Sequence, residues 1–351
     1  MKHVTDPTTQ RTGMFGTQSQ TIALAVMLVV LIAAPFITYP PFLMECMCFA
    51  LFALAFNLLV GYVGLLSFGH GLYWGWASYM SAHAAKDWGL SPELAILVGT
   101  ATATICGVIA GSIAIRRQGI YFAMITLALA QMMYFVALRA KFTGGEDGIQ
   151  AVPRGHLFGV LGLSNDLTMY FFVLLVFLAG FLLIHRIIHS PFGEVLKAIR
   201  ENEPRAISLG YKTDRYKLMA FVLSATLAGL AGATKALVVQ IASLTDVTWQ
   251  MSGEVILMTL LGGAGTFLGP VVGAGVVVTL QDVLSDRVGS WVTVIIGGVF
   301  VACVLLFRKG IVGEFLAWRA RRSVRAPVGG SADTPAVEAT PAASEAAVSS
   351  R

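Results

Sequence analysis

The sequence predicts an all-α integral membrane protein, a polytopic bundle of about ten transmembrane helices, some of them short or broken. The chain has 351 residues, of which 56% are hydrophobic and only 12% are charged. A soluble domain carries roughly 25% charged residues. The mean hydropathy is +0.77, and long uncharged runs recur along the chain. Such runs are typical of membrane spans rather than of buried core helices.

Ten apolar segments account for the predicted spans: 21–39, 42–60, 64–84, 94–115, 119–138, 167–186, 217–239, 254–266, 269–284 and 290–307. The first is longer than the roughly 15 residues of a signal-peptide core, so we interpret it as an uncleaved helix. The eighth and ninth are short and Gly-rich, with only GGAGTFLG between them. Non-helical backbone at membrane depth needs cover from protein or water. Residues 254–284 are therefore either two spans or one broken element.

The distribution of charge predicts how the spans are oriented. If both termini are cytoplasmic, most of the 24 Lys and Arg residues fall in inner segments. Such retention on the cytoplasmic side is typical of membrane proteins. We therefore expect a multi-pass protein of an inner (plasma) membrane with membrane lipid around it. The positive charges form no basic stripe with exposed aromatic residues, so nucleic acid is not an expected partner.

The hydrophilic parts of the chain suggest four regions. These are a cytoplasmic segment 1–20, a transmembrane domain 21–307, a basic juxtamembrane segment 308–325 and a disordered tail 326–351. The tail is rich in Ala, Pro and Ser and cannot bury a core. The basic segment is either an amphipathic helix on the inner leaflet or the positive anchor of the last span.

The inner segment 189–217 is far longer than a connection between two spans requires. Ser190 followed by Pro191 is a typical helix start, and Gly210 is a typical helix end. Between them lies an apolar stripe formed by Phe192, Val195, Leu196 and Ile199. The pattern predicts two short helices on the cytoplasmic face. We favour a docking surface over a solvated connector, because a connector has little need for such a stripe.

Enzyme chemistry has no visible basis in this chain. The sequence contains no GxxxxGK[ST] phosphate loop, no HExxH or GxSxG motif and no paired carboxylates on a loop. The four cysteines lie in apolar segments without a metal-ligand set. We predict no enzyme activity, no catalytic residue, no metal and no cofactor. If transport consumes ATP, a separate chain must bind it.

Polar residues within the predicted spans are candidates for function, because ionisable groups at membrane depth are costly. The ionisable ones are Glu45, His70, Lys235, Glu254 and Asp282. The three carboxylates lie near span ends, where water reaches them, and Lys235 is close enough to an end to extend to the interface. His70, between two glycines, is either a pathway residue or a packing histidine. The candidate translocation path comprises Asn57, Ser67, His70 and Gln131.

Several blocks of the sequence match one family in order. They are NLLVGY at 57–62, LSFGHG at 66–71, GIYFAM at 119–124, TGGEDG at 143–148, AIRENE at 198–203, and the glycines from Gly262 to Gly269. With these blocks, residues 45–312 resemble the permease subunits of branched-chain amino-acid ABC transporters. The resemblance is to the LivM/LivH type, closer to LivM, and it implies a type II ABC importer fold.

The resemblance also implies partners: a second permease subunit in a heterodimer, two cytoplasmic ATP-binding subunits and a periplasmic solute-binding protein. It implies an ATPase-coupling region at 189–217, with the candidate residues Glu194, Arg200, Glu201, Glu203, Arg205, Ala206 and Gly210. Importers of this kind usually carry Glu-Ala-Ala before a Gly. Here only Ala206 and Gly210 match that pattern.

The expected function is therefore ATP-driven import of branched-chain amino acids or a related small organic solute. Two alternatives stay open: an ion-gradient-driven secondary transporter, and an importer of urea or amides. A secondary transporter also fits broken, Gly-rich segments, but it needs a cluster of carboxylates or hydroxyls within the membrane, and centrally placed candidates are sparse in this sequence.

Overall fold

The computed structural model describes residues 26–157, 159, 161–288, 294, 295, 297, 298, 301, 305 and 310–314. The chain divides into two compact units, Met1–Phe315 and Leu316–Arg351, and the described residues belong to the first. The predicted segment 1–20, most of the tenth span, most of the basic segment and the tail 326–351 lie outside the described residues. The predicted division at 20, 307 and 325 stays a prediction.

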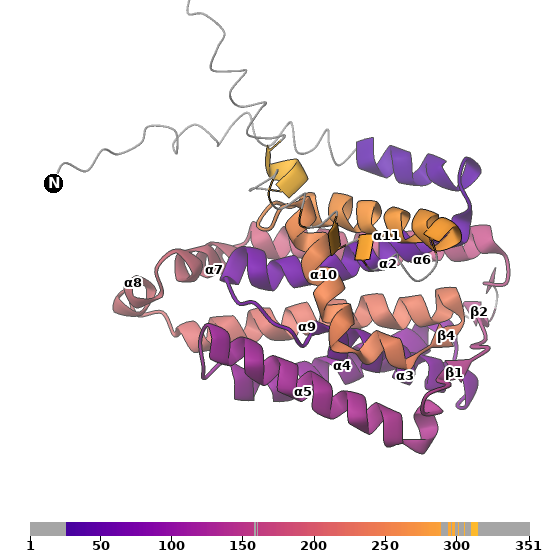
Figure 1. Cartoon of the computed structure of the whole chain (residues 1–351), viewed down its shortest axis with the longest axis horizontal. Helices are drawn as coiled ribbons and strands as arrows, with labels where there is room; N and C mark the ends of the chain where they lie inside the picture. Colours follow the sequence, from indigo (N-terminus) through magenta and orange to yellow (C-terminus); the bar gives the residue numbers. More distant parts are fainter. Residues whose placement is uncertain are drawn as a thin grey trace, which may run out of the picture. The chain divides into compact units, whose positions relative to one another are not determined.

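The described part is almost entirely helical, which confirms the predicted class (Figure 1). Its elements after the first helix, Val26–Phe36, are α2 (Pro40–Asn57), η3 (Leu58–Val63), α3 (His70–Lys86), α4 (Pro92–Ala114), α5 (Ile120–Arg139), η4 (Lys141–Thr143), β1 (Ile149–Gln150), β2 (His156–Leu157), β3 (Leu161–Gly162), α6 (Asp166–Ile188), α7 (Pro191–Glu201), α8 (Glu203–Ser208), α9 (Thr213–Val239), β4 (Ile241–Ala242), η5 (Leu244–Val247), α10 (Trp249–Gly262) and α11 (Gly269–Val288). The end of the first helix forms η2 (Ala34–Phe36).

Five helices among the described residues are long and apolar enough to cross a membrane: Pro40–Val63, α4, α5, α6 and α9. The predicted spans from the second to the ninth each have a helical counterpart. The third begins later than predicted, because residues 64–69 are non-helical and α3 starts only at His70. Residues 263–268 likewise separate α10 from α11. We call these two stretches the 64–69 segment and the 263–268 break.

Helix α9 is the centre of the bundle and packs against α2, α3 and α4. Small residues permit this close packing, as expected for helices within a membrane. A Cβ atom on Gly107 of α4 would lie 2.6 Å from the Ala225 side chain of α9. One on Gly232 of α9 would collide with the Trp74 carbonyl of α3. Helices α10 and α11 pack on each other and on α2, and α6 also packs on α2.

The two ends of the bundle carry different structures (Figure 1). At one end, α7 contacts η3 and α9, and α8 follows it; we call this the coupling end. At the other, β1 pairs antiparallel with β4, Ile149 opposite Ala242. The strand pairing brings the long connection after α5 against the connection after α9. Helix α2 also departs from regular geometry, because its last turn, η3, is a π-helix. Such widened turns are frequent at functional sites.

Candidate functional site

The coupling end begins with two capped helices, as predicted. Ser190 Oγ accepts a hydrogen bond from the Gly193 amide at 3.4 Å, with Pro191 in the first turn of α7. Asn202 ends α7, and its Oδ1 accepts from the Arg205 amide at 3.1 Å to start α8. Gly210, with φ of +88°, follows α8 and adopts the left-handed conformation that favours glycine. The boundaries of this region are therefore encoded locally.

The apolar stripe of α7 faces the chain's own bundle. Leu196 and Ile199 are buried, and Phe192 stacks on Tyr216 of α9 with ring centres 5.7 Å apart. The stripe is therefore no evidence for a partner, and docking at 189–217 stays a prediction. The stripe is covered by this chain and holds α7 against α9 and η3, so an external contact has to use the opposite face.

The seven candidate coupling residues separate by direction. Glu194, Glu201, Arg205 and Gly210 are exposed. Beside them, Ile207 and Leu209 expose 55% and 69% of their surface, unusual for a charged segment unless something covers them. Ala206 is buried. We call the set Glu194, Glu201, Arg205, Ile207, Leu209 and Gly210 the outer face of the coupling region.

Glu203 has an internal role in this arrangement. Its carboxylate forms an ion pair with Lys217, which is buried near the start of α9. It also accepts a hydrogen bond from Gln118 Nε2 at 3.0 Å, from the connection between α4 and α5. Glu203 therefore attaches α8 to two other parts of the bundle.

Arg200 is also exposed, but its tip reaches inward. Its Nη1 donates a hydrogen bond to the carbonyl of Gly61 in η3. Next to it, Asn57 Nδ2 donates to the Thr266 carbonyl and Asn57 Oδ1 accepts from the Gly265 amide, both at 2.9 Å. A buried amide side chain thus supplies the partners that the 263–268 break would otherwise lack.

His70 lies in a closed polar site at the start of α3. Its Nε2 is 2.8 Å from Ser224 Oγ of α9, and Ser224 Oγ donates to the Ala55 carbonyl at 2.6 Å. The rings of Phe56, Tyr73 and Phe221 surround the imidazole, with centres 4.9 to 6.2 Å away. These contacts join α2, α3 and α9. Because His70 is fully buried, the site is not open to solute in this conformation.

The other two path candidates lie elsewhere. Ser67 is buried in the 64–69 segment, and its Oγ accepts from the Gly69 amide at 3.2 Å. Gln131 is half-buried on α5. The structure thus does not gather Asn57, Ser67, His70 and Gln131 into one pocket, although the first three flank the two non-helical stretches.

An open apolar cleft of about 520 Å³ lies near them. Its walls come from the 64–69 segment, from the first two turns of α5 and from the start of α10. The lining residues are Gly64, Leu65, Leu66, Phe68, Gly119, Ile120, Phe122, Ala123, Met124, Leu127 and Trp249. The sequence analysis did not single out Trp249. A tryptophan at the first position of a short helix, directly after polar residues, was the available signal.

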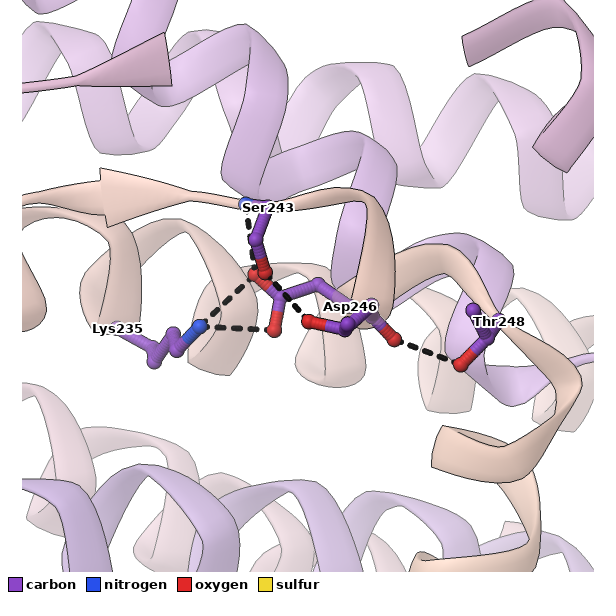
Figure 2. A network of polar contacts seen from close by, with 5 residues as sticks. Lys235, Ser243, Asp246 and Thr248 are labelled. Atoms are coloured by element: carbon purple, nitrogen blue, oxygen red, sulfur yellow. Dashed lines mark hydrogen bonds and ion pairs between the residues drawn. The ribbon is translucent and has the colours of Figure 1, made fainter. Parts of the chain in front are cut away.

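A buried ion pair joins α9 to η5 at the end opposite the coupling end. Lys235 Nζ lies 2.8 Å from both carboxylate oxygens of Asp246 (Figure 2). Asp246 Oδ2 also accepts from the Ser243 amide at 3.3 Å, within a capping box. Lys235 therefore does not extend to the interface as predicted. It turns inward to a partner 11 residues along the chain, which periodicity does not reveal.

These features describe a helical membrane protein with two short helices, α7 and α8, at one end of the bundle and an open apolar cleft. The family model described as "Branched-chain amino acid transport system / permease component" matches residues 41–304. The chain belongs to this family: it is a multi-pass inner-membrane protein and a permease subunit of an ABC importer.

Curated relatives agree with the family assignment. The chain is 26% identical to the high-affinity branched-chain amino acid transport system permease protein LivM of Salmonella typhimurium, over 89% of this chain and 79% of the relative. It is 27% identical to LivM of Escherichia coli, over 76% and 68%. It is 28% identical to the ribose import permease protein RbsC of Bacillus subtilis, over 63% and 70%. No solved structure matches the chain.

Proposed function

We propose that this subunit translocates branched-chain amino acids or a related small organic solute. The apolar cleft is the observation that carries the proposal. Its lining offers aliphatic and aromatic side chains, which suit a solute with a branched apolar group. The relatives named LivM point to the same cargo, whereas the relative named RbsC imports ribose.

The path in this proposal runs along the cleft. Ser67 and Gln131 belong to two of the three elements that form its walls. Asn57 and His70 do not line the cleft. Asn57 holds the 263–268 break and His70 holds the start of α3. The cleft opens at the surface of the single chain, with Leu66 40% and Met124 61% exposed. In the proposed assembly a second permease subunit, forming a heterodimer, closes it.

The proposed driving force comes from two cytoplasmic ATP-binding subunits. The outer face of the coupling region receives one of them, with Arg205, Glu201 and Glu194 making charged contacts and Ile207 and Leu209 apolar ones. A periplasmic binding protein delivers the solute to the opposite end. This orientation places both termini in the cytoplasm, in agreement with the distribution of Lys and Arg.

The test is uptake by the complete importer in proteoliposomes, with leucine, ribose, urea and acetamide supplied in turn. Leucine uptake that requires ATP and survives collapse of the proton gradient supports the proposal. Uptake that persists without ATP but stops with the gradient supports a secondary transporter. Uptake of urea or acetamide alone supports the amide alternative.

The cleft itself is tested with Trp249→Ala. This variant should lower leucine uptake while leaving assembly intact, since it removes a large wall of the path. The matched control is Trp88→Ala, because Trp88 is also about half exposed, at 54% against 46%, but lies outside the cleft. Equal uptake by the two variants would contradict the role of the cleft.

A further inference from the structure

We infer that Arg200 is a positioning residue that transmits movement of the coupling helices to the wall of the apolar cleft. This inference rests on the proposed docking of an ATP-binding subunit at the coupling end. Three segments far apart in the sequence meet at Arg200: α7, the π-helical turn η3 and the 263–268 break.

The first connection runs from α7 to η3. Arg200 Nη1 donates to the Gly61 carbonyl, which lies in the π-helical turn. A π-turn leaves carbonyl groups imperfectly paired within the helix, so a charged donor is a strong partner for one of them. The aliphatic part of Arg200 also lies against Gly64, where an added Cβ would be 3.2 Å from Arg200 Cγ. Gly64 has a φ of +82° and lines the cleft.

The second connection runs from η3 to the 263–268 break. The backbones of Gly61 and Gly265 are so close that a Cβ on Gly61 would lie 2.7 Å from the Gly265 nitrogen. A Cβ on Gly265 would in turn be 3.2 Å from Arg200 Nη1 and 3.3 Å from the Gly61 carbonyl oxygen. Asn57 fastens the same break through its hydrogen bonds to Thr266 and Gly265. No spare volume separates the three segments.

The irregular backbone of η3 and of the 263–268 break allows movement to pass from α7 to the cleft. Neither η3 nor the break has a regular α-helical hydrogen-bond ladder, so each can change its backbone angles at lower cost than the helices beside it. The chain passes from Gly61 to the cleft-lining residues Gly64, Leu65 and Leu66 within a few residues. A displacement of α7 therefore reaches the cleft through the Arg200 guanidinium, which is the polar link in the packing of α7 on η3. The buried stripe of α7, which includes Leu196 and Ile199, makes α7 move as a unit with this end of the bundle.

The experiment measures how the cleft wall responds to ATP. Leu66→Cys is introduced into a chain whose native Cys46, Cys48, Cys106 and Cys303 are replaced by Ala, and the full importer is assembled in proteoliposomes. The rate of labelling by a water-soluble maleimide is compared between the nucleotide-free state and the state trapped with ATP and vanadate. With Arg200 present, the two rates should differ; with Arg200→Ala, we expect about a tenfold loss of that difference, within the usual range of coupling between sites.

Three further single variants serve as comparisons. Arg116→Gln, at an exposed arginine of the connection between α4 and α5, should keep the full response. Arg200→Lys, which retains one donor for the Gly61 carbonyl, should give an intermediate response. Asn57→Ala should reduce the response as well, and combining it with Arg200→Ala should add little further loss, because both act on the same junction.

Retention of the ATP-binding subunits by each variant is measured in parallel, by co-purification. Arg200→Ala should retain them to within about twofold, whereas Arg205→Glu on the outer face should release them. A full ATP response of the maleimide labelling at position 66 in Arg200→Ala would overturn the inference. So would loss of the ATP-binding subunits from Arg200→Ala to the same extent as from Arg205→Glu. If instead Arg205→Glu releases nothing, the docking site is wrong and the proposed function fails at that point, while the labelling comparison still reports on Arg200.

Discussion

Lys235 and Asp246 form an ion pair in which one ammonium group lies 2.8 Å from both oxygens of one carboxylate, with both side chains almost completely buried. The pair holds the end of α9 to η5, and η5 packs on α3 and α5. It therefore fixes the short connection that leads to Trp249 and the cleft.

Removing one partner of this pair should be costly. Asp246→Ala leaves Lys235 buried without its counter-charge, and breaking a buried pair in this way typically costs about 3 to 5 kcal/mol. We expect a large drop in the thermal stability of the detergent-solubilised protein. The double variant Lys235→Met/Asp246→Leu should recover much of it, since no unpaired charge remains. Asp147→Asn, at an exposed carboxylate of the same end, is the control; an equal loss there would show that the effect is not specific to the pair.

Disrupting the polar site at His70 should lower the stability less than breaking the Lys235–Asp246 pair does. Ser224→Ala removes the partner of His70 Nε2 and also the hydrogen bond to the Ala55 carbonyl. A buried polar group left without a partner costs about 1 to 3 kcal/mol. Thermal unfolding should therefore begin at a lower temperature than in the wild type. Ser112→Ala, whose hydroxyl is exposed on α4, should change little. Unaltered stability in Ser224→Ala would mean that water replaces the lost hydroxyl.

The close packing of α9 on α3 predicts that replacing Gly232 by alanine lowers stability far more than replacing Gly253. Gly232→Ala drives a methyl group into the Trp74 carbonyl, and backbone atoms cannot yield as a flexible side chain does. We expect a loss of about 1 to 3 kcal/mol from overpacking, or more if the helices separate. Gly253→Ala in α10 meets nothing within 4 Å and should be neutral or slightly stabilising, because alanine favours helix. Comparable melting temperatures for the two variants would contradict the close approach.

The separation of the coupling residues by direction predicts two distinct phenotypes. Glu203→Gln weakens the ion pair with buried Lys217, so the permease itself should lose thermal stability. Glu201→Gln, at an exposed neighbour, should leave stability unchanged and reduce co-purification of the ATP-binding subunits. If Glu203→Gln is as stable as the wild type and Glu201→Gln is not, the assignment of inner and outer faces is reversed.

The sequence was sufficient for the class and for most helix positions because both follow from local properties. Apolar length predicts α2, α4, α5, α6 and α9, and the Ser190-Pro191 start and Gly210 define α7 and α8. Glycine density also located the 263–268 break, whereas the 64–69 segment was predicted as part of the third span.

Contacts between residues far apart in the sequence could not be predicted from these local properties. The partners of Asn57 lie 208 and 209 residues away, and that of His70 lies 154 residues away. No periodicity encodes such contacts. The stripe on α7 was predicted correctly as a stripe, yet its amphipathic pattern carries no information on whether the covering surface belongs to the same chain. Gln131 and the predicted path as a whole still await the transport measurements described above.

Under the proposed docking of an ATP-binding subunit, the two faces of α7 and α8 divide the constraints on their sequence between two genes. Substitutions at Phe192, Leu196, Ile199 and Glu203 must be matched within this permease. Those at Glu201, Arg205, Ile207 and Leu209 can be matched only in a different polypeptide. Re-pairing this permease with the ATP-binding subunits of a relative should therefore require transplanting the outer positions alone. A chimera that exchanges the whole segment 189–217 would import foreign residues into its own bundle and misfold before its new partner could bind.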